Sequence, residues 1–135
     1  MTLLELAVTV TIVGVVLSTA APRYTHLRDR LAVDGATSAL TSALADTRHL
    51  AGRWNRRTAL SIDTATATLT LHAGSDTLER IPLAALFGIS LAASRDSLAY
   101  YPSGLGYGAS NSTLVVRRGA AAETVTVSRI GRVRR

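Results

Sequence analysis

The first 24 residues, MTLLELAVTVTIVGVVLSTAAPRY (1–24), decide the fold. Residues 6–21 carry no charged side chain, and a single carboxylate, Glu5, directly precedes them. With a helical rise of about 1.5 Å per residue, residues 1–21 cover about 30 Å, the thickness of the hydrocarbon core of a bilayer. The many valines and isoleucines do not prevent a helix there, because lipid forces the backbone to satisfy its hydrogen bonds internally. Residues 1–21 are therefore predicted to form a transmembrane helix.

Glu5 is the unusual feature of this predicted helix. An acid in or near hydrocarbon is costly, so it normally has a partner and a role. The first basic side chain after it is Arg23, so the nearest cation is an α-amino group, either the chain's own or that of a neighbouring copy. Pairing with a neighbour would set a repeating axial register, as in a filament subunit. A plain membrane anchor and a truncated signal peptide remain as alternatives, although a signal peptide carries a basic segment ahead of its apolar core.

The start of the chain also matches a known pattern. Met1-Thr-Leu-Leu-Glu5, the apolar run, Gly14 and Pro22 together resemble the mature N-terminus of type IV pilins and type II secretion pseudopilins. The resemblance implies that Glu5 neutralises the N-terminal amine of an adjacent subunit during assembly. It implies that Met1, where the family usually has Phe, is the processed and methylated N-terminus left by a prepilin peptidase. Gly14 and Pro22 fall on the two helix-weakening positions of the family, and the stretch between them is expected to lose helicity in a filament.

Helical spacing continues after Pro22. Apolar residues recur at intervals of three to four positions or multiples of these, which predicts a helix over about 23–54 whose apolar stripe over 36–54 packs in a core. Gly52 is predicted to mark the end of this helix, and Gly35 is expected to weaken it locally. The apolar stripe consists of Leu27, Leu31, Ala36, Leu40, Leu44, Leu50 and Trp54.

From residue 58 the pattern changes to a period of two, which predicts a small, mostly antiparallel β-domain over about 58–135. Residues 102–112 are predicted to form a loop, and residues 119–122 the turn of a hairpin. The predicted fold class is α+β, with one long N-terminal helix packed on the β-domain and no second domain. The predicted strands are 58–63, 66–72, 77–83, 89–93, 98–101, 112–118 and 123–130.

Three stretches of this second part resemble the GspH/FimT group of minor pseudopilins and pilins: SALADTRHLAGRWNRRTALSI (42–62), AYYPSGLGYG (99–108) and TVTVSRIGRVRR (124–135). The resemblance implies a pilin-like fold, with residues 1–21 as the transmembrane and filament-core helix and residues 22–135 as a periplasmic domain. It implies a single-pass protein of the bacterial inner membrane whose partners are the prepilin peptidase and other pilin or pseudopilin subunits. The implied function is that of a minor pseudopilin of a type II secretion system, or a minor subunit of a type IV pilus, that primes or joins a periplasmic filament for protein export.

The sequence offers little for catalysis. The chain has no cysteine, and its three histidines are scattered without a paired spacing, so no metal site is expected. Gly104, Gly106 and Gly108 lie in a loop with no helix after it, so they are interpreted as turn glycines rather than a phosphate-binding motif. Glu79 and Glu123 are interpreted as isolated surface carboxylates. We therefore expect a structural subunit that is not an enzyme and uses no cofactor and no small-molecule substrate.

The chain has a net charge of +6, and all 15 of its basic residues are arginine. Six of them lie at the ends of the last two predicted strands and are expected to gather at one region, where Arg53, Arg56 and Arg57 would extend the positive surface. Such a surface binds phosphates without sequence readout, and the alternative is a solvated basic face. The ending Gly131-Arg-Val-Arg134 also resembles the motif through which some FimT-type minor pilins of naturally competent bacteria bind DNA. The alternative function is therefore DNA uptake through Arg117, Arg118, Arg129, Arg132, Arg134 and Arg135.

Two smaller groups of residues also suggest binding roles. Three tyrosines would be able to stack on nucleic-acid bases, with packing in the core or loop as the alternative: Tyr100, Tyr101 and Tyr107. A basic cluster follows the apolar segment, where contact with anionic lipid headgroups is the simplest role: Arg23, His26, Arg28 and Arg30.

Overall fold

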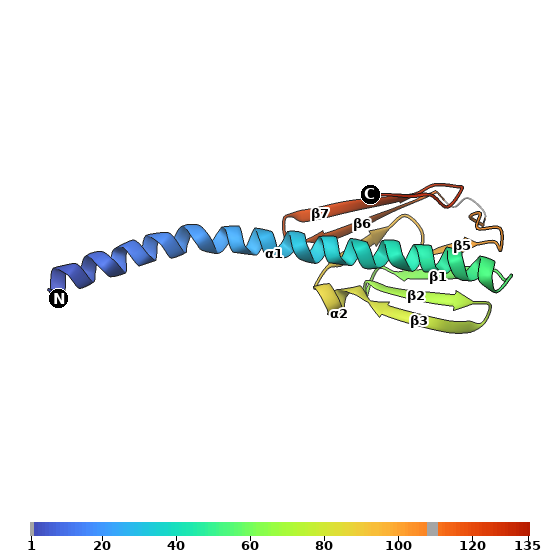
Figure 1. Ribbon diagram of the computed structural model, residues 1–135, viewed down its shortest axis with the longest axis horizontal. Coiled ribbons are helices and arrows are strands. Elements are labelled where there is room, and N and C mark those ends of the chain that lie inside the picture. The colour runs from blue at the N-terminus through green and yellow to red at the C-terminus, as the bar shows by residue number, and fades with distance from the viewer. Residues whose placement is uncertain (1, 108–110) are drawn as a thin grey trace.

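The computed structural model shows a long helix whose second half packs on a β-rich head, while its first half projects freely (Figure 1). It describes residues 2–107 and 111–135, without the side chains of residues 19–21. Met1 and Gly108, which the sequence analysis singled out, lie outside the described residues. The elements are α1 (Leu3–Arg53), β1 (Thr58–Asp63), β2 (Thr68–Ala73), β3 (Asp76–Pro82), α2 (Leu83–Phe87), β4 (Ser90–Ala93), β5 (Ser97–Tyr100), β6 (Ser112–Arg118), β7 (Ala121–Val127) and β8 (Val133–Arg134).

Helix α1 is continuous over 51 residues and includes Pro22 in its interior. Its end lies close to the predicted one: Trp54 is the C-cap and donates its backbone N–H to the Leu50 carbonyl at 3.0 Å. Asn55 then turns the chain away with a φ of +49°. The chain reverses within four residues and enters β1, so the first strand runs back along the helix.

The head contains two four-stranded antiparallel sheets, with strand orders β3-β2-β1-β5 and β4-β6-β7-β8. The predicted strands match the observed ones apart from shifted ends.

Two elements were not predicted. The short helix α2 starts at Leu83, where a strand was expected to finish, because Pro82 ends the ladder and the helix-forming run LAALF follows, closed by Gly88 at a φ of +63°. The predicted strand 123–130 ends at Val127, and the chain then turns into β8.

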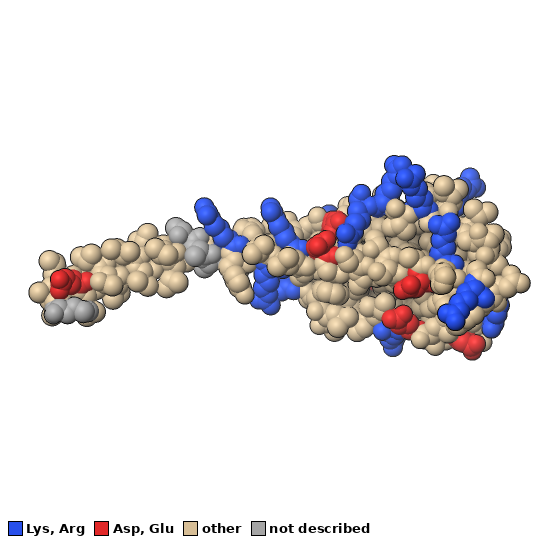
Figure 2. Space-filling view, in the orientation of Figure 1, with Lys and Arg blue, Asp and Glu red and all other residues tan. Residues whose placement is uncertain are grey.

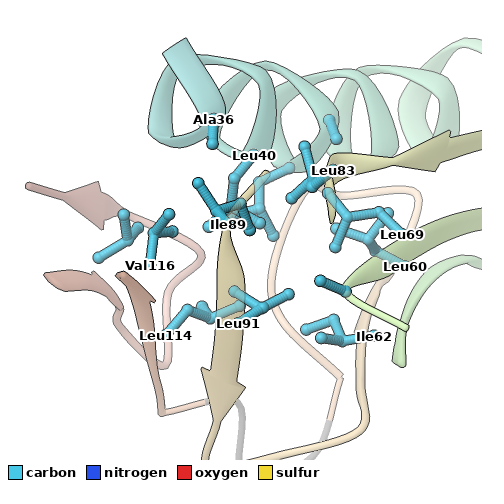
Figure 3. Packing of buried hydrophobic residues seen from close by; sticks show 14 of the residues in the cluster. Ala36, Leu40, Leu60, Ile62, Leu69, Leu83, Ile89, Leu91, Leu114 and Val116 are labelled. Atoms are coloured by element: carbon cyan, nitrogen blue, oxygen red, sulfur yellow. The ribbon is translucent and has the colours of Figure 1, made fainter. Parts of the chain in front are cut away.

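The core lies between α1 and the two sheets (Figure 3). Ala36, Leu40 and Leu44 of α1 are buried against strand residues such as Leu60 and Val116. Core packing was predicted for the stripe over 36–54, and at its end this was wrong for Trp54, which is exposed. Leu27 and Leu31, which precede that stretch, are exposed as well. The head covers α1 only from about residue 29 onward, so the earlier leucines have no part of this chain to pack against.

Gly35 has a packing role. A Cβ built on it would lie 2.9 Å from the ring of Phe87 in α2. The absence of a side chain at this position therefore lets α2 lie against α1, and the helix continues through Gly35 without interruption. The glycine that the sequence suggested as a weak point fixes the place where the two helices meet.

Candidate assembly site and basic surfaces

Glu5 lies in the first turn of α1 and forms a reciprocal capping box with Thr2. The Thr2 N–H donates to Glu5 Oε2 at 2.7 Å, and the Glu5 N–H donates to Thr2 Oγ1 at 3.3 Å. The carboxylate is also favoured by the positive end of the helix dipole. This arrangement was not predicted, although the spacing Thr-x-x-Glu is its signature. The side chain is exposed, and among the described residues it has no ion pair.

The apolar segment that follows Glu5 is uncovered. Leucines, valines and isoleucines from Leu3 to Leu17 are each at least half exposed, on all faces of the helix. By length and composition α1 is suited to cross a membrane, and none of its most apolar window is buried. A surface of this kind needs lipid or another protein to cover it. Gly14 lies in this segment with nothing within 4 Å of a Cβ built on it, so it makes no room for a contact among the described residues.

The predicted gathering of six arginines was wrong. In the β6–β7 hairpin, Arg118 lies opposite Ala121 next to the turn, while the other end pairs Ser112 with Val127. Six residues at about 3.3 Å each separate these ends by about 20 Å. Arg117 and Arg118 therefore lie at one end of the sheet, and Arg129 and Arg132 follow its other end. The face shown in Figure 2 accordingly has basic side chains spread along the helix and head instead of one dense patch.

Arg118 has a structural partner. Its Nε donates to Asp29 Oδ1 of α1 at 3.0 Å, and its Nη1 donates to the Phe87 carbonyl of α2. Both side chains of the ion pair are mostly buried, with exposed fractions of 21% for Arg118 and 23% for Asp29. This contact ties the hairpin end to both helices, so Arg118 is not free to bind a ligand.

Arg135 also forms ion pairs that join separate elements of the fold. Its guanidinium lies 3.6 Å from Asp34 and 3.7 Å from Glu123, and it donates to Ser38 Oγ at 2.8 Å. Glu123 is therefore not the isolated surface carboxylate that we expected. The contacts join the C-terminal residue to α1 and to β7.

Between Val127 and Arg135 the chain makes a tight turn. The Gly131 N–H donates to the Ser128 carbonyl at 2.8 Å, and the Ser128 N–H donates to the Arg132 carbonyl at 2.8 Å. Gly131 has a φ of +75°, and a Cβ built on it would lie 2.9 Å from the Tyr100 ring. The turn thus requires glycine both for its backbone angle and for the approach to Tyr100.

Arg132, which closes this turn, and Arg134, which follows it in β8, are both exposed and line one groove, and Arg132 also lines a second groove. One groove, of about 670 Å³, lies over the ends of β6 and β7 and is lined by Arg129, Arg132 and Arg134. The other, of about 800 Å³, is bordered by Arg132 and by three cationic or titratable side chains of the last turns of α1. Those three are Arg48, His49 and Arg53, of which the sequence analysis had included only Arg53 in the basic surface. We call these two grooves together the tail grooves.

The three tyrosines are divided between core and surface. Tyr100 is 2% exposed, and its hydroxyl has no hydrogen-bond partner among the described residues. Burial raises its pKa above the ordinary value, and the Arg48 charge offsets this in part. Tyr101 and Tyr107 are exposed, with ring centroids 5.0 Å apart, and Arg57 lies 4.6 Å above the Tyr107 ring. Only these last two present an aromatic surface to a ligand.

Two of the three loop glycines lie in the described residues. Gly104 has a φ of +77°, as expected of a turn glycine, and Gly106 forms a β-bridge with Tyr100. In the part of the chain that the structure describes, no group of three or more His, Cys, Asp or Glu side chains is placed to hold a metal ion.

Comparisons with protein-family models and with curated protein sequences find no match. The comparison with solved structures does find matches. The type IV minor pilin FimU of Pseudomonas aeruginosa strain PAO1 aligns over 78% of this chain and 88% of its own, with 15% identity and a TM-score of 0.65. The minor pseudopilin EpsH of the type II secretion system of Vibrio cholerae aligns over 76% of this chain and 94% of its own, with 17% identity and a TM-score of 0.59.

These similarities establish the fold. The chain has the pilin fold shared by minor pilins and minor pseudopilins: one long N-terminal helix packed on antiparallel sheets. The predicted fold class is confirmed. One matched protein is named as a type IV minor pilin and the other as a minor pseudopilin of a type II secretion system, so the fold alone does not distinguish between these two classes.

Proposed function

We propose that the chain is a minor pilin or pseudopilin, a structural subunit that joins or primes a periplasmic filament. The observation that carries this proposal is the combination of a pilin-like head with an apolar half-helix that nothing in the described chain covers. Residues 1–21 anchor the subunit in the inner membrane before assembly and enter the filament core afterwards, while residues 22–135 form the periplasmic domain. A prepilin peptidase generates and methylates the N-terminus at Met1, and the partners are other pilin subunits.

In this proposal the Glu5 carboxylate neutralises the amine of a neighbouring subunit. The geometry supports that role because the carboxylate is exposed at the helix start and, among the described residues, hydrogen-bonds within its own first turn to Thr2. An unpaired acid in an apolar filament core would be costly, so pairing with an amine also fixes the axial position of each subunit. Gly14 and Pro22 let the helix adapt between them as the subunits pack.

The capping box gives Glu5 a second role that an experiment must separate from assembly. Gln at position 5 retains the hydrogen bond to the Thr2 N–H but removes the charge. Thr2→Ala retains the charge but removes the oxygen that accepts the Glu5 N–H. In a bacterium that lacks this subunit and forms fewer filaments as a result, we expect Thr2→Ala to restore filament number and Glu5→Gln to fail. If Glu5→Gln restores filaments as well as the wild type does, the carboxylate has no assembly role.

The type II secretion pseudopilin is the first assignment, and a DNA-binding minor pilin for natural transformation is the second. The tail grooves favour the second, because Arg132 and Arg134 are exposed beside a further basic face of α1. Phosphates of a nucleic-acid backbone would bind these arginines, and Tyr101 and Tyr107 offer stacking surfaces.

A titration of the detergent-solubilised full chain with fluorescent double-stranded DNA tests this second function. We expect micromolar binding that weakens as salt rises and is lost in Arg132→Ala/Arg134→Ala. The matched control is Arg28→Ala/Arg80→Ala, which removes the same charge from α1 and β3, outside the arginines named for DNA binding. If both double variants weaken binding equally, or neither does, the tail grooves have no specific role and the secretion pseudopilin is favoured.

A further inference from the structure

The segment of α1 between the apolar span and the head has one apolar face that no other part of the described chain covers. Tyr24, Leu27 and Leu31 follow a spacing of three and four residues, so they lie on the same side of the helix. Leu27 is 56% exposed and Leu31 is 63% exposed. Gly35 continues this spacing and contacts Phe87, so the same side of α1 faces α2.

Helix α2 extends this apolar face onto the head. Its Leu86 is 61% exposed, next to the Phe87 that packs on Gly35. Figure 1 shows α2 at the end of the head nearest to the free half of α1. Tyr24, Leu27, Leu31 and Leu86 therefore form a surface that begins where the apolar span ends, and we call it the collar face.

The charges around the collar face are positive. Arg23, His26 and Arg30 line a shallow groove of about 360 Å³ together with Leu27. Neither Arg23 nor Arg30 has an ion pair among the described residues. The nearby acids are engaged elsewhere, because Asp29 pairs with Arg118 and Asp34 pairs with Arg135. A leucine bordered by two unpaired guanidinium groups matches the boundary between acyl chains and anionic headgroups.

From this combination we infer that the collar face binds the surface of an anionic bilayer and holds the unassembled head against it. The inference rests on the proposed membrane insertion of residues 1–21. Tyr24 lies at the level where aromatic side chains favour the membrane interface. Arg23 and Arg30 extend towards phosphates while Leu27, Leu31 and Leu86 contact the acyl boundary.

Contact of Leu31 and Leu86 with the headgroup layer requires α1 to tilt away from the bilayer normal. An upright helix crosses a hydrocarbon core of about 30 Å in about 20 residues, so a span that starts at Leu3 ends near Pro22. A tilt of about 35°, within the range seen for membrane helices, lengthens that path to about 37 Å or about 24 residues. The span then ends near Leu27, and Leu31 lies about 6 Å further along the helix, within a headgroup layer of about 5–7 Å. Tilting towards the collar face also lowers α2, so Leu86 reaches the same layer.

The chain has no cysteine, so single nitroxide labels test this inference cleanly. The full-length chain is labelled after Leu86→Cys, Leu17→Cys or Leu105→Cys and reconstituted at low density into vesicles. One set of vesicles contains only phosphatidylcholine, and the other contains about one-third phosphatidylglycerol. Relative access of oxygen and a water-soluble nickel complex reports whether each label lies in lipid or in water.

We expect the label at position 17 to lie in lipid in both vesicles and the label at position 105, on the distal loop, to lie in water. The label at position 86 should enter the interface only with phosphatidylglycerol. Each arginine near an anionic surface strengthens membrane binding by a factor of about 5. Arg23→Gln/Arg30→Gln should therefore lower the ratio of immersed to water-exposed label at position 86 by about 25-fold. The matched control Arg53→Gln/Arg56→Gln, at the last residue of α1 and in the turn that follows it, should leave the ratio unchanged.

Three results would overturn the inference, and they have different meanings. Water access at position 86 in both vesicles, with position 17 in lipid, rejects membrane binding by the collar face while the anchor stands. Water access at position 17 rejects the membrane insertion itself, and with it part of the proposed function. Protection at position 86 that follows protein density and not lipid charge identifies the collar face as a contact between subunits.

Discussion

The ion pair between Arg118 and Asp29 allows a prediction of the stability lost when Arg118 is replaced. Arg118→Met removes a 3.0 Å charge-assisted hydrogen bond to Asp29 and a second bond to the Phe87 carbonyl, while preserving most of the side-chain volume. Hydrogen bonds to charged groups contribute about 1.5–3 kcal/mol each when buried. Because both side chains of the ion pair retain about one-fifth of their exposure, we reduce the combined value to about 2–4 kcal/mol.

Thermal unfolding of the full chain in detergent, followed by circular dichroism, measures this loss. For a domain of about this size, a destabilisation of 1 kcal/mol lowers Tm by about 4 °C, so Arg118→Met should lower it by about 8–16 °C. The neighbouring variant Arg117→Met is the control: this exposed side chain has no ion pair among the described residues, and its effect should stay within about 0.5 kcal/mol. A double-mutant cycle with Asp29→Asn should give a coupling of about 1–2 kcal/mol. Equal Tm values for the two methionine variants, or no coupling, would refute the argument.

Three further predictions concern the head. Gly131→Ala places a Cβ 2.9 Å from the Tyr100 ring at a φ of +75°, so it should cost about 2–4 kcal/mol; urea unfolding checks this, and an unchanged midpoint would contradict it. Leu40→Ala empties a fully buried position and should cost about 2–5 kcal/mol in the same assay, whereas a cost below about 1 kcal/mol would place Leu40 outside the core. Tyr100→Phe removes a buried hydroxyl without a partner, so at neutral pH it should leave stability unchanged or raise it by up to about 1 kcal/mol. Burial raises the folded-state pKa of Tyr100. The neutral side chain therefore stabilises the wild-type fold below about pH 10, and this stability is lost as pH rises through the folded-state pKa. When Tm is measured against pH, the fall of Tm at alkaline pH should be smaller for Tyr100→Phe than for the wild type, and identical falls would reject this contribution.

The regular parts of the fold follow directly from sequence periodicity. The helical spacing of Leu40 and Leu44, and the alternation in 58–63 and 112–118, identify elements that bury one face, and the structure confirms them. Local periodicity does not report what each face meets. Leu27 and Leu31 continue the stripe of the core, yet the head does not extend to them.

The basic surface was harder to predict because it depends on tertiary topology. The sequence shows Arg118 and Arg129 following consecutive strands, but a hairpin brings together the end of one strand and the start of the next, so the two arginines lie at opposite ends. The ion pairs of Arg118 and Arg135 with Asp29 and Asp34 join residues about 90–100 positions apart, and no local pattern predicts such pairs. The capping box of Glu5, in contrast, was visible as Thr-x-x-Glu and was overlooked because the membrane cost of the acid dominated the interpretation.

The central claim is that this chain is a filament subunit, and its distribution in the cell tests that most directly. Filaments are sheared from bacteria that produce the epitope-tagged full chain, separated from membranes, and quantified by mass spectrometry together with the major subunit. We predict that the chain is present in the filament fraction at a small, constant ratio to the major subunit, and that it leaves the membrane only when the major subunit is produced. A chain that remains in the membrane fraction while filaments assemble normally without it would contradict the account.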